Sequence, residues 1–123
     1  MHKNQGPVYY NDYLMLDQLL ASQKPLSREH ATQMDPEAHE ETLFIVVHQA
    51  YELWFKQMLH DLNSILAIFK RDQVHDTDLG TIVQRLERFT KIQHHIGGQL
   101  EILETMTPMD FLEFRNLLIP ASG

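Results

Sequence analysis

The feature that most constrains this chain is an unbroken apolar run from Leu43 to Val47 inside a longer helical pattern. A helix turns once in about 3.6 residues, so five consecutive apolar side chains go all the way round it. This run predicts a turn that is covered on every side. His48 follows directly and shares a helical face with Phe44, four residues earlier. The spacing alone favours a core histidine bonded to a backbone carbonyl, and the alternative is a residue that lines a pocket.

Apolar residues recur at helical spacing over two long segments. The first segment begins at Asp35 and Pro36, because aspartate can cap a helix and proline suits its first position, and it continues to Phe69. After a polar connection, Thr77 or Asp78 can cap a second helix. The second helix carries a heptad seam with one polar position, formed by Leu79, Ile82, Leu86, Phe89, Gln93, Ile96, Leu100 and Leu103. The short connection predicts that the two helices pack antiparallel as a hairpin.

Shorter helices flank this hairpin. Asn11 or Asp12 can cap an amino-terminal helix. Its apolar side holds Leu16, Leu19 and Leu20. Thr107 as the cap, Pro108 in the first position and Asp110 in the third predict a second short helix.

The predicted fold class is therefore all-α, with long antiparallel helices in a bundle. The 123 residues form one region, with an amino-terminal arm and short helix at 1–23, the hairpin at 36–106, and a short helix and turn at 107–123. Gly97 and Gly98 lie inside the second long helix, where each costs about 1 kcal/mol relative to alanine. We expect either a close approach to the backbone there or a bend.

Composition excludes several classes of function. Without cysteine the chain has no disulfide, no thiolate metal site and no covalent haem attachment, and this favours a reducing compartment, the cytoplasm. A formal net charge of −7 argues against a nucleic-acid partner. Neither an apolar stretch of membrane-spanning length nor an export signal occurs, so no membrane partner is expected. No glutamate is followed by histidine three residues later, as a dimetal bundle site requires, and no metal ligand is assigned.

Four ordered blocks of this sequence resemble the tryptophan 2,3-dioxygenase family. They are YNDYLMLDQLLASQ at 10–23, LFIVVHQAYELWFKQ at 43–57, LETMT at 103–107 and FRNLLIPASG at 114–123. The resemblance implies that this chain is the amino-terminal part of a larger helical haem dioxygenase, truncated relative to the family. It implies a reaction of L-tryptophan with dioxygen to N-formylkynurenine, in the kynurenine pathway of tryptophan catabolism. It further implies haem b with its axial histidine beyond residue 123, and a homo-oligomer, a tetramer built as paired dimers.

The resemblance also implies roles for individual residues. His48 corresponds to the catalytic distal histidine that faces the indole nitrogen, and Arg115 to the arginine that holds the substrate carboxylate. From the residues alone, Arg115 is either snorkelling or holding an anion. The other implied substrate-binding residues are Phe44, Ile45, Val46, Val47 and Phe111, with Tyr10, Tyr13 and Leu14 contributed to a neighbouring subunit. Ser122 and Gly123 fall on the turn beside the haem.

Two other classes of protein stay open on the sequence. One is a non-catalytic helical oligomerisation module, which the heptad seam and the long helices fit equally well. The other is a relative that binds a small aromatic ligand without turning it over. A Soret band of stoichiometric intensity in the purified protein would distinguish a haem protein from both.

Overall fold

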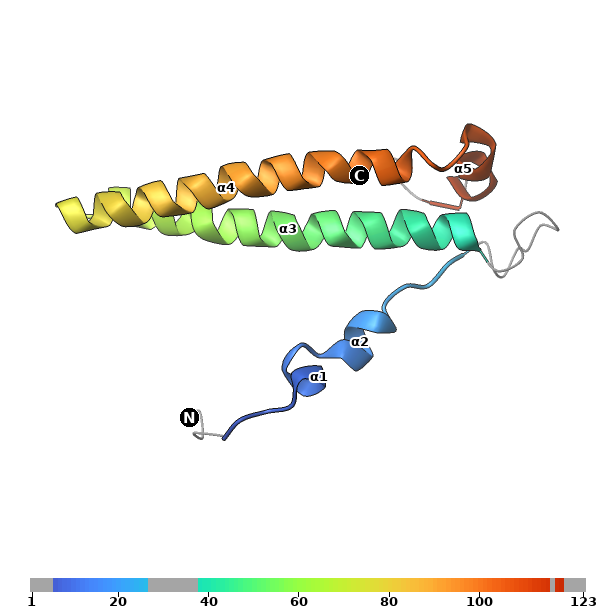
Figure 1. Cartoon of the computed structure of the whole chain (residues 1–123), viewed down its shortest axis with the longest axis horizontal. Coiled ribbons are helices and arrows are strands. Elements are labelled where there is room, and N and C mark those ends of the chain that lie inside the picture. Colours follow the sequence, from blue (N-terminus) through green and yellow to red (C-terminus); the bar gives the residue numbers. More distant parts are fainter. Residues whose placement is uncertain (1–5, 27–37, 116, 119–123) are drawn as a thin grey trace.

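The computed structural model describes residues 6–26, 38–115 and 117–118, and all regular structure in these residues is helical. The helices are α1 (Tyr10–Tyr13), α2 (Leu16–Leu20), α3 (His39–Phe69), α4 (Asp76–Leu103) and α5 (Pro108–Arg115). The two long helices, α3 and α4, lie side by side and run antiparallel (Figure 1). The predicted all-α fold with a long helical hairpin is therefore confirmed. In the part of the chain that is described, no helix is both long and apolar enough to cross a bilayer.

A small apolar cluster holds the two long helices together near the closed end of the hairpin. Ile65 and Ile68 of α3 and Ile82 of α4 are each about 95% buried and touch one another. Further along, the Tyr51 hydroxyl donates a 2.8 Å hydrogen bond across to the Ile96 carbonyl. Contacts between α3 and α4 thus run along most of the length of both helices.

One buried carboxylate lies in the middle of this helix pair. Asp61 of α3 is 4% exposed, lies 3.5 Å from the Arg88 guanidinium of α4, and accepts a hydrogen bond from Gln57 Nε2. A buried charge requires such partners, because it has lost its hydration. Next to it, the Trp54 and His95 rings meet edge to face with centroids 5.4 Å apart.

The predicted seam on α4 is only partly correct. Its members Leu79, Leu86, Gln93 and Leu100 are exposed, whereas the remaining four are buried or half-buried. Apart from Thr81, the least exposed positions of α4 are Asp78, Ile82, Arg85, Phe89, Ile92, Ile96, Gln99 and Leu103. This strip includes three polar residues that a search for apolar periodicity passes over. The face against α3 is therefore rotated by about one residue from the prediction.

The apolar run that follows the start of α3 is less covered than predicted. Only Val47 is buried, Leu43, Phe44 and Ile45 are half-buried, and Val46 is 46% exposed. Within the described part of the chain this turn is therefore not covered on every side. The physical reason is that a two-helix hairpin covers only one side of each helix.

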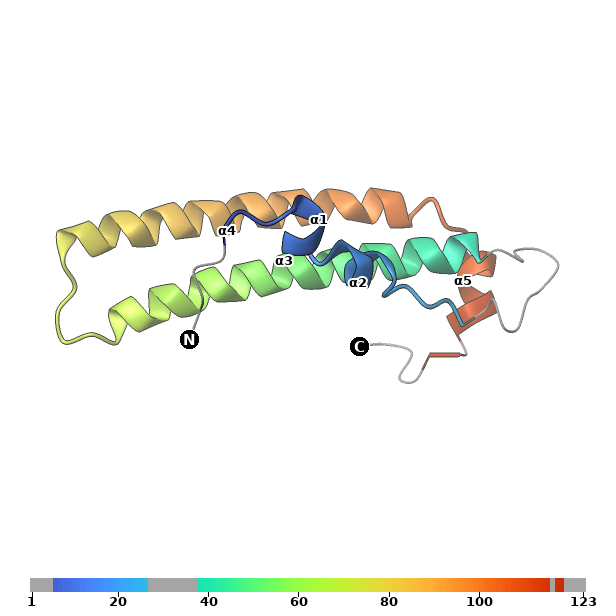
Figure 2. The same cartoon turned by 90° about the horizontal axis from the view of Figure 1, so that it is seen from below.

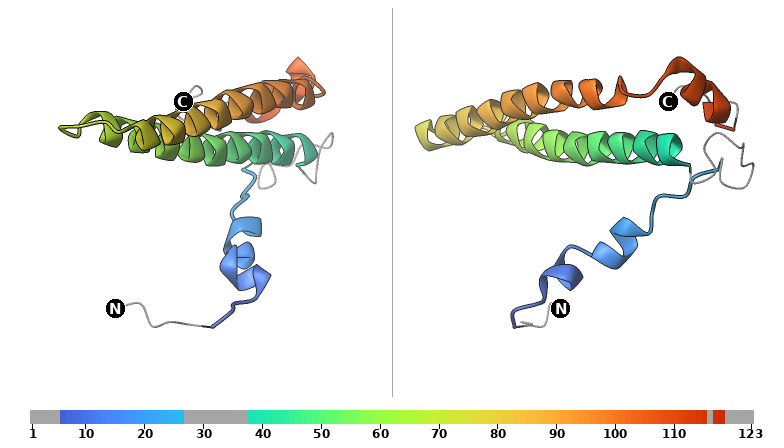
Figure 3. Two further views of the ribbon diagram at one scale, coloured as in Figure 1. Left: turned by 60° about the vertical axis from the view of Figure 1, so that its left-hand side comes forward. Right: turned by 45° about the vertical axis from the view of Figure 1, so that its right-hand side comes forward.

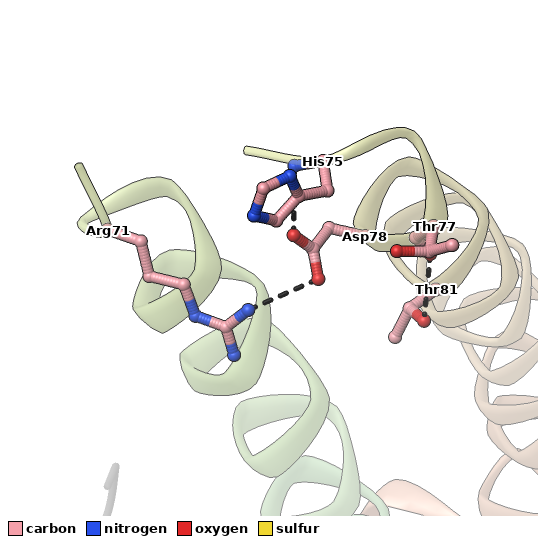
Figure 4. A network of polar contacts seen from close by, with 5 residues as sticks. All are labelled: Arg71, His75, Thr77, Asp78 and Thr81. Atoms are coloured by element: carbon pink, nitrogen blue, oxygen red, sulfur yellow. Dashed lines mark hydrogen bonds and ion pairs between the residues drawn. The ribbon is translucent and has the colours of Figure 1, made fainter. Parts of the chain in front are cut away.

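The start of α4 differs from the prediction by one or two residues. The helix begins at Asp76 with His75 as its N-cap, so neither Thr77 nor Asp78 is the cap. Asp78 lies instead at the third helical position, where its carboxylate accepts a 3.0 Å hydrogen bond from the His75 backbone N–H. Its other oxygen lies 3.1 Å from the Arg71 guanidinium at the end of α3 (Figure 4).

The predicted start of α5 is confirmed. The Asp110 N–H donates to Thr107 Oγ1 at 3.2 Å, and the Thr107 N–H donates to the Asp110 carboxylate at 3.1 Å. This reciprocal pair satisfies two backbone donors that the helix itself leaves free. The predicted cap of α3 at Asp35 and Pro36 lies outside the described residues.

The amino-terminal arm contains two short helices where one was predicted. Asn11 and Asp12 lie inside α1, whose N-cap is Tyr9, so neither is a cap. Met15 separates α1 from α2 with a left-handed backbone, φ 54°. Both helices project away from the hairpin (Figures 1 and 3). Among the described helices, α1 lies against α2 only.

The arm is tied to α3 by the segment that follows α2. The Gln23 side chain donates a 2.8 Å hydrogen bond to the Gln49 side-chain oxygen, and the Leu26 N–H donates at 2.8 Å to the buried Glu41 carboxylate. Figure 2 shows this segment running along the hairpin towards the end where α5 lies. These bonds place the arm on the α3 side of the hairpin.

Candidate functional site

Three phenylalanines join α5 to the start of α3. The Phe44 ring lies 5.8 Å from Phe111 and 5.2 Å from Phe114, measured between centroids, and the latter two are 5.6 Å apart. Phe114 is 2% exposed. Such tilted and edge-to-face pairs contribute beyond simple area burial. The cluster therefore fixes α5 across the open end of the hairpin.

His48 lies at the edge of this aromatic cluster in a defined orientation. Its ring centroid is 4.0 Å from that of Phe44, with 32° between the ring planes, and its Nδ1 lies 2.7 Å from the Phe44 carbonyl oxygen. A carbonyl oxygen can only accept, so Nδ1 carries the proton. In the neutral ring, Nε2 is then a free acceptor. The expected bond to a backbone carbonyl is present, but the expected burial in the core is wrong, because His48 is exposed.

Two cavities share Phe44 and His48 in their walls. The large groove, about 810 Å³, lies between the arm, α3 and α5, and its lining includes Leu19, Ser22, Lys24, Leu26, Glu41, Ile45, Gln49, Glu52, Leu53, Lys56, Phe114 and Leu118. The small cavity, about 320 Å³, is lined in addition by Leu103, Met106, Thr107, Pro108 and Phe111. Both are mainly apolar with a few polar groups, which is the usual character of a small-molecule site. The His48 imidazole is thus accessible from both cavities.

Arg115 is exposed and is the last residue of α5. It follows Phe111 by four residues, so the two side chains leave the same side of the helix. Among the described residues its guanidinium has no hydrogen-bond or ion-pair partner, and it lines neither cavity. The structure therefore shows an arginine beside the aromatic cluster whose charge is free to hold an anion.

The structure brings some of the predicted site residues together and not others. Phe44, His48 and Phe111 meet around the small cavity, and Ile45 lines the large groove. Val47 is buried and Val46 is exposed, and neither lines a cavity. Ser122 and Gly123 lie outside the described residues.

The predicted arm residues do not reach His48 within one chain. Tyr10 is 70% exposed, Tyr13 is 74% exposed and Leu14 is 40% exposed. They stand on or beside α1, which projects away from the hairpin (Figure 3). Within the described chain they line neither of the two cavities at His48.

Several residues of this site were not singled out from the sequence. Phe114 completes the aromatic cluster, and its spacing of three from Phe111 on a short helix is a signal that could have identified it. Glu41 and Gln49 bind the arm, but their partners are distant in the sequence, so no local pattern reveals them. In the described part of the chain, no group of three or more acidic or histidine side chains could hold a metal ion.

Comparison with known proteins gives a consistent match over the whole chain. A family model described as tryptophan 2,3-dioxygenase matches residues 1–123. Proteins named tryptophan 2,3-dioxygenase from Alteromonas mediterranea and Dictyostelium discoideum are 50% identical over 123 residues and 52% identical over 119 residues, covering 100% and 97% of this chain. The one from Bdellovibrio bacteriovorus is 51% identical over 117 residues, or 95% of the chain. These stretches are 33%, 29% and 32% of the respective relatives, so the chain spans about a third of their length.

Proposed function

This chain belongs to the tryptophan 2,3-dioxygenase family, and from that premise we propose that it supplies the distal side of the substrate pocket in a haem-dependent dioxygenase. The reaction opens the indole ring of L-tryptophan between C2 and C3, and both atoms of dioxygen enter the product, N-formylkynurenine. We propose this activity for a protein of the relatives' length, of which the present chain is the amino-terminal third.

The observation that carries the proposal is the orientation of His48. Its Nδ1–H is engaged by the Phe44 carbonyl at 2.7 Å, so the neutral ring presents Nε2 as an acceptor towards the cavities. The indole N–H of tryptophan is a donor without acceptor character, and it is complementary to that nitrogen. An imidazole held in this way would orient the indole ring before reaction.

The neighbouring residues suit the rest of the substrate. Phe44 and Phe111 offer aromatic faces against which an indole can pack. Arg115, one turn after Phe111, can bind the substrate carboxylate through two parallel N–H···O bonds. Position 111 carries phenylalanine and has no hydroxyl, so it contributes packing and no hydrogen bond.

We propose haem b as the cofactor, with the large groove as the described surface that would contact one face of it. The large groove has apolar walls from Ile45, Leu53 and Phe114, and it also holds Lys24 and Lys56, which can pair with propionate carboxylates. When bound, the haem would supply the activation of dioxygen, which no side chain of this chain can provide. In line with the family resemblance, we propose that the axial histidine lies beyond residue 123.

The proposal also includes a homo-oligomer, most readily a tetramer. The exposed aromatic residues Tyr10 and Tyr13, with Leu14, lie on an arm that its own hairpin does not cover. We propose that this arm closes the substrate pocket of a neighbouring subunit.

The role of His48 can be tested by replacing the donor on the substrate. In a protein of the relatives' length, wild type should prefer L-tryptophan by about tenfold in kcat/KM over the analogue with oxygen in place of the ring N–H, because one hydrogen bond is lost. The His48→Ala variant should keep its Soret band and lose most of this preference. Retention of the full preference by that variant would refute the assignment.

A further inference from the structure

Two side-chain amides attach the segment that leads out of α2 to α3. They belong to Gln23 and Gln49, and we call this pair the amide clip. Gln23 Nε2 donates a 2.8 Å hydrogen bond to Gln49 Oε1 and a 3.0 Å bond to the Leu19 carbonyl in α2. Gln49 Nε2 donates to the Ser22 carbonyl at 3.2 Å and to the Ser22 hydroxyl oxygen at 3.3 Å. The amide clip therefore joins the end of α2 to α3 at the residue that follows His48.

A second attachment lies three residues further along the chain. The Leu26 N–H donates at 2.8 Å to the carboxylate of Glu41, which is 2% exposed. Glu41 and Gln49 are about 12 Å apart along α3, at 1.5 Å per residue. The backbone from Gln23 to Leu26 can span at most about 11 Å. This stretch, residues 22–26, which we call the strap, thus has a span similar to the separation of its two attachments, and losing either one frees an end.

The strap forms one wall of the large groove at His48. Its residues Ser22, Lys24 and Leu26 line that groove, and His48 lines it from α3. Gln23 is not among the described side chains that line the groove. A change at Gln23 can therefore alter the groove only through the position of the strap.

The bond between the two amides is the best shielded part of the amide clip. It is partly buried, whereas the bonds from Gln49 to Ser22 are exposed. Water competes less for a shielded hydrogen bond, and removing one partner leaves the other unsatisfied. We therefore expect the Gln23 donor to contribute most to holding the strap.

We propose that the amide clip positions the strap as a wall of the large groove, and that the strap thereby retains the group that the groove binds. Gln23 is then a positioning residue, because it acts through the strap. A wall attached at both ends moves aside only when a bond to α3 opens, so the bound group should leave slowly. The inference rests on the proposed function in one respect, namely that haem b contacts this groove.

The first test measures whether the amide clip holds the strap. Gln23→Met keeps the length of the side chain and removes its donors, whereas Gln23→Lys keeps donors at a similar reach. In a protein of the relatives' length, amide exchange in the peptide that contains Leu26 should become about fivefold faster in Gln23→Met, because a hydrogen bond is lost. It should stay within about twofold of wild type in Gln23→Lys. Mass spectrometry measures this exchange without reference to haem or activity.

Gln18→Met is the matched control for this test. Gln18 is exposed on α2, and among the described residues its side chain has no hydrogen bond. The same substitution there should leave exchange at Leu26 within about twofold of wild type. Unchanged exchange in Gln23→Met, or equal acceleration in Gln18→Met, would overturn the proposal.

The second test measures whether the strap acts on the groove. In the same proteins, haem loss is followed through the Soret band after an excess of a haem-free globin is added as acceptor. Gln23→Met should speed haem loss about fivefold, because the wall opens more often, while Gln23→Lys and Gln18→Met stay within about twofold of wild type. Faster exchange at Leu26 with unchanged haem loss would refute the positioning role. A wild type without a Soret band would overturn the proposed cofactor and the retention of haem, whereas exchange at Leu26 would still decide whether the clip holds the strap.

Discussion

At the scale of single residues, Asp61 is a charged side chain that the fold buries. It is 4% exposed and is held by Arg88 and Gln57. We predict that Asp61→Asn lowers the free energy of unfolding by about 1–3 kcal/mol, because a charged hydrogen-bonding group is lost while the half-exposed Arg88 stays hydrated. The exposed Asp72 provides the control, and Asp72→Asn should change the free energy of unfolding by less than about 0.5 kcal/mol. Urea denaturation measures both, and equal effects would show that the Asp61 pair adds nothing.

Arg115 differs from Asp61 because it is exposed and, among the described residues, has no partner to lose. In a protein of the relatives' length, Arg115→Lys and Arg115→Ala should raise KM for L-tryptophan, since a charged hydrogen-bond pair is worth about 1.5–3 kcal/mol. The melting temperature should stay within about 2 °C of wild type, as expected for a change at an exposed position. Steady-state kinetics and thermal unfolding separate the two effects. Unchanged KM values would remove Arg115 from the substrate site.

At the scale of elements, α5 is a short helix of only eight residues, so its stability depends on how its ends are held. Its first turn is closed by the reciprocal bonds between Thr107 and Asp110. Thr107→Ala should destabilise this helix by about 1 kcal/mol and speed amide exchange in α5 about fivefold, while the middle of α4 stays protected. Thr105→Ala is the matched control, because the Thr105 hydroxyl bonds only to the preceding turn, at the Ile102 carbonyl. Equal exchange in both variants would mean that the cap does not hold α5.

The elements also show what the sequence can and cannot predict. The hairpin follows from periodicity, and the start of α5 follows from the order of Thr107, Pro108 and Asp110, because both signals are local. The face of α4 against α3 was misplaced because Asp78, Arg85 and Gln99 take part in it. The burial of these three polar side chains depends on their interaction partners, and local sequence spacing does not reveal those partners.

The contacts of the candidate site also fall into those that local spacing predicts and those that it does not. Phe44 and His48 are four residues apart on one helix, so their contact could be predicted from spacing. The contact between Phe44 and Phe111 requires α5 to fold back over the hairpin. From the sequence, this contact was expected only through the family resemblance. The bonds of Glu41 and Gln49 to the arm had no sequence signal.

At the scale of the whole molecule, the described chain exposes more apolar surface than its own helices can cover. A two-helix hairpin buries one side of each helix, so the aromatic arm and four apolar side chains of α4 (Leu79, Val83, Leu86 and Leu100) remain open. These are two different surfaces, since α1 lies on the α3 side of the hairpin and the four side chains belong to α4 (Figure 1). An assembly that used both would have two kinds of interface, as a tetramer built from paired dimers does.

The proposed contact of the arm with a neighbouring subunit can be tested by deletion. Tyr9, Tyr10 and Tyr13 are 70–84% exposed, and α1 contacts no described helix except α2. If these rings bury themselves on a neighbouring chain, removal of residues 1–20 should lower the stability and the mass of the oligomer, because that interface is lost. The hairpin should keep its helicity, since the bonds of Gln23 and Leu26 to α3 remain. Sedimentation equilibrium and circular dichroism give the two readouts. An unchanged mass after the deletion would mean that the arm belongs to its own subunit.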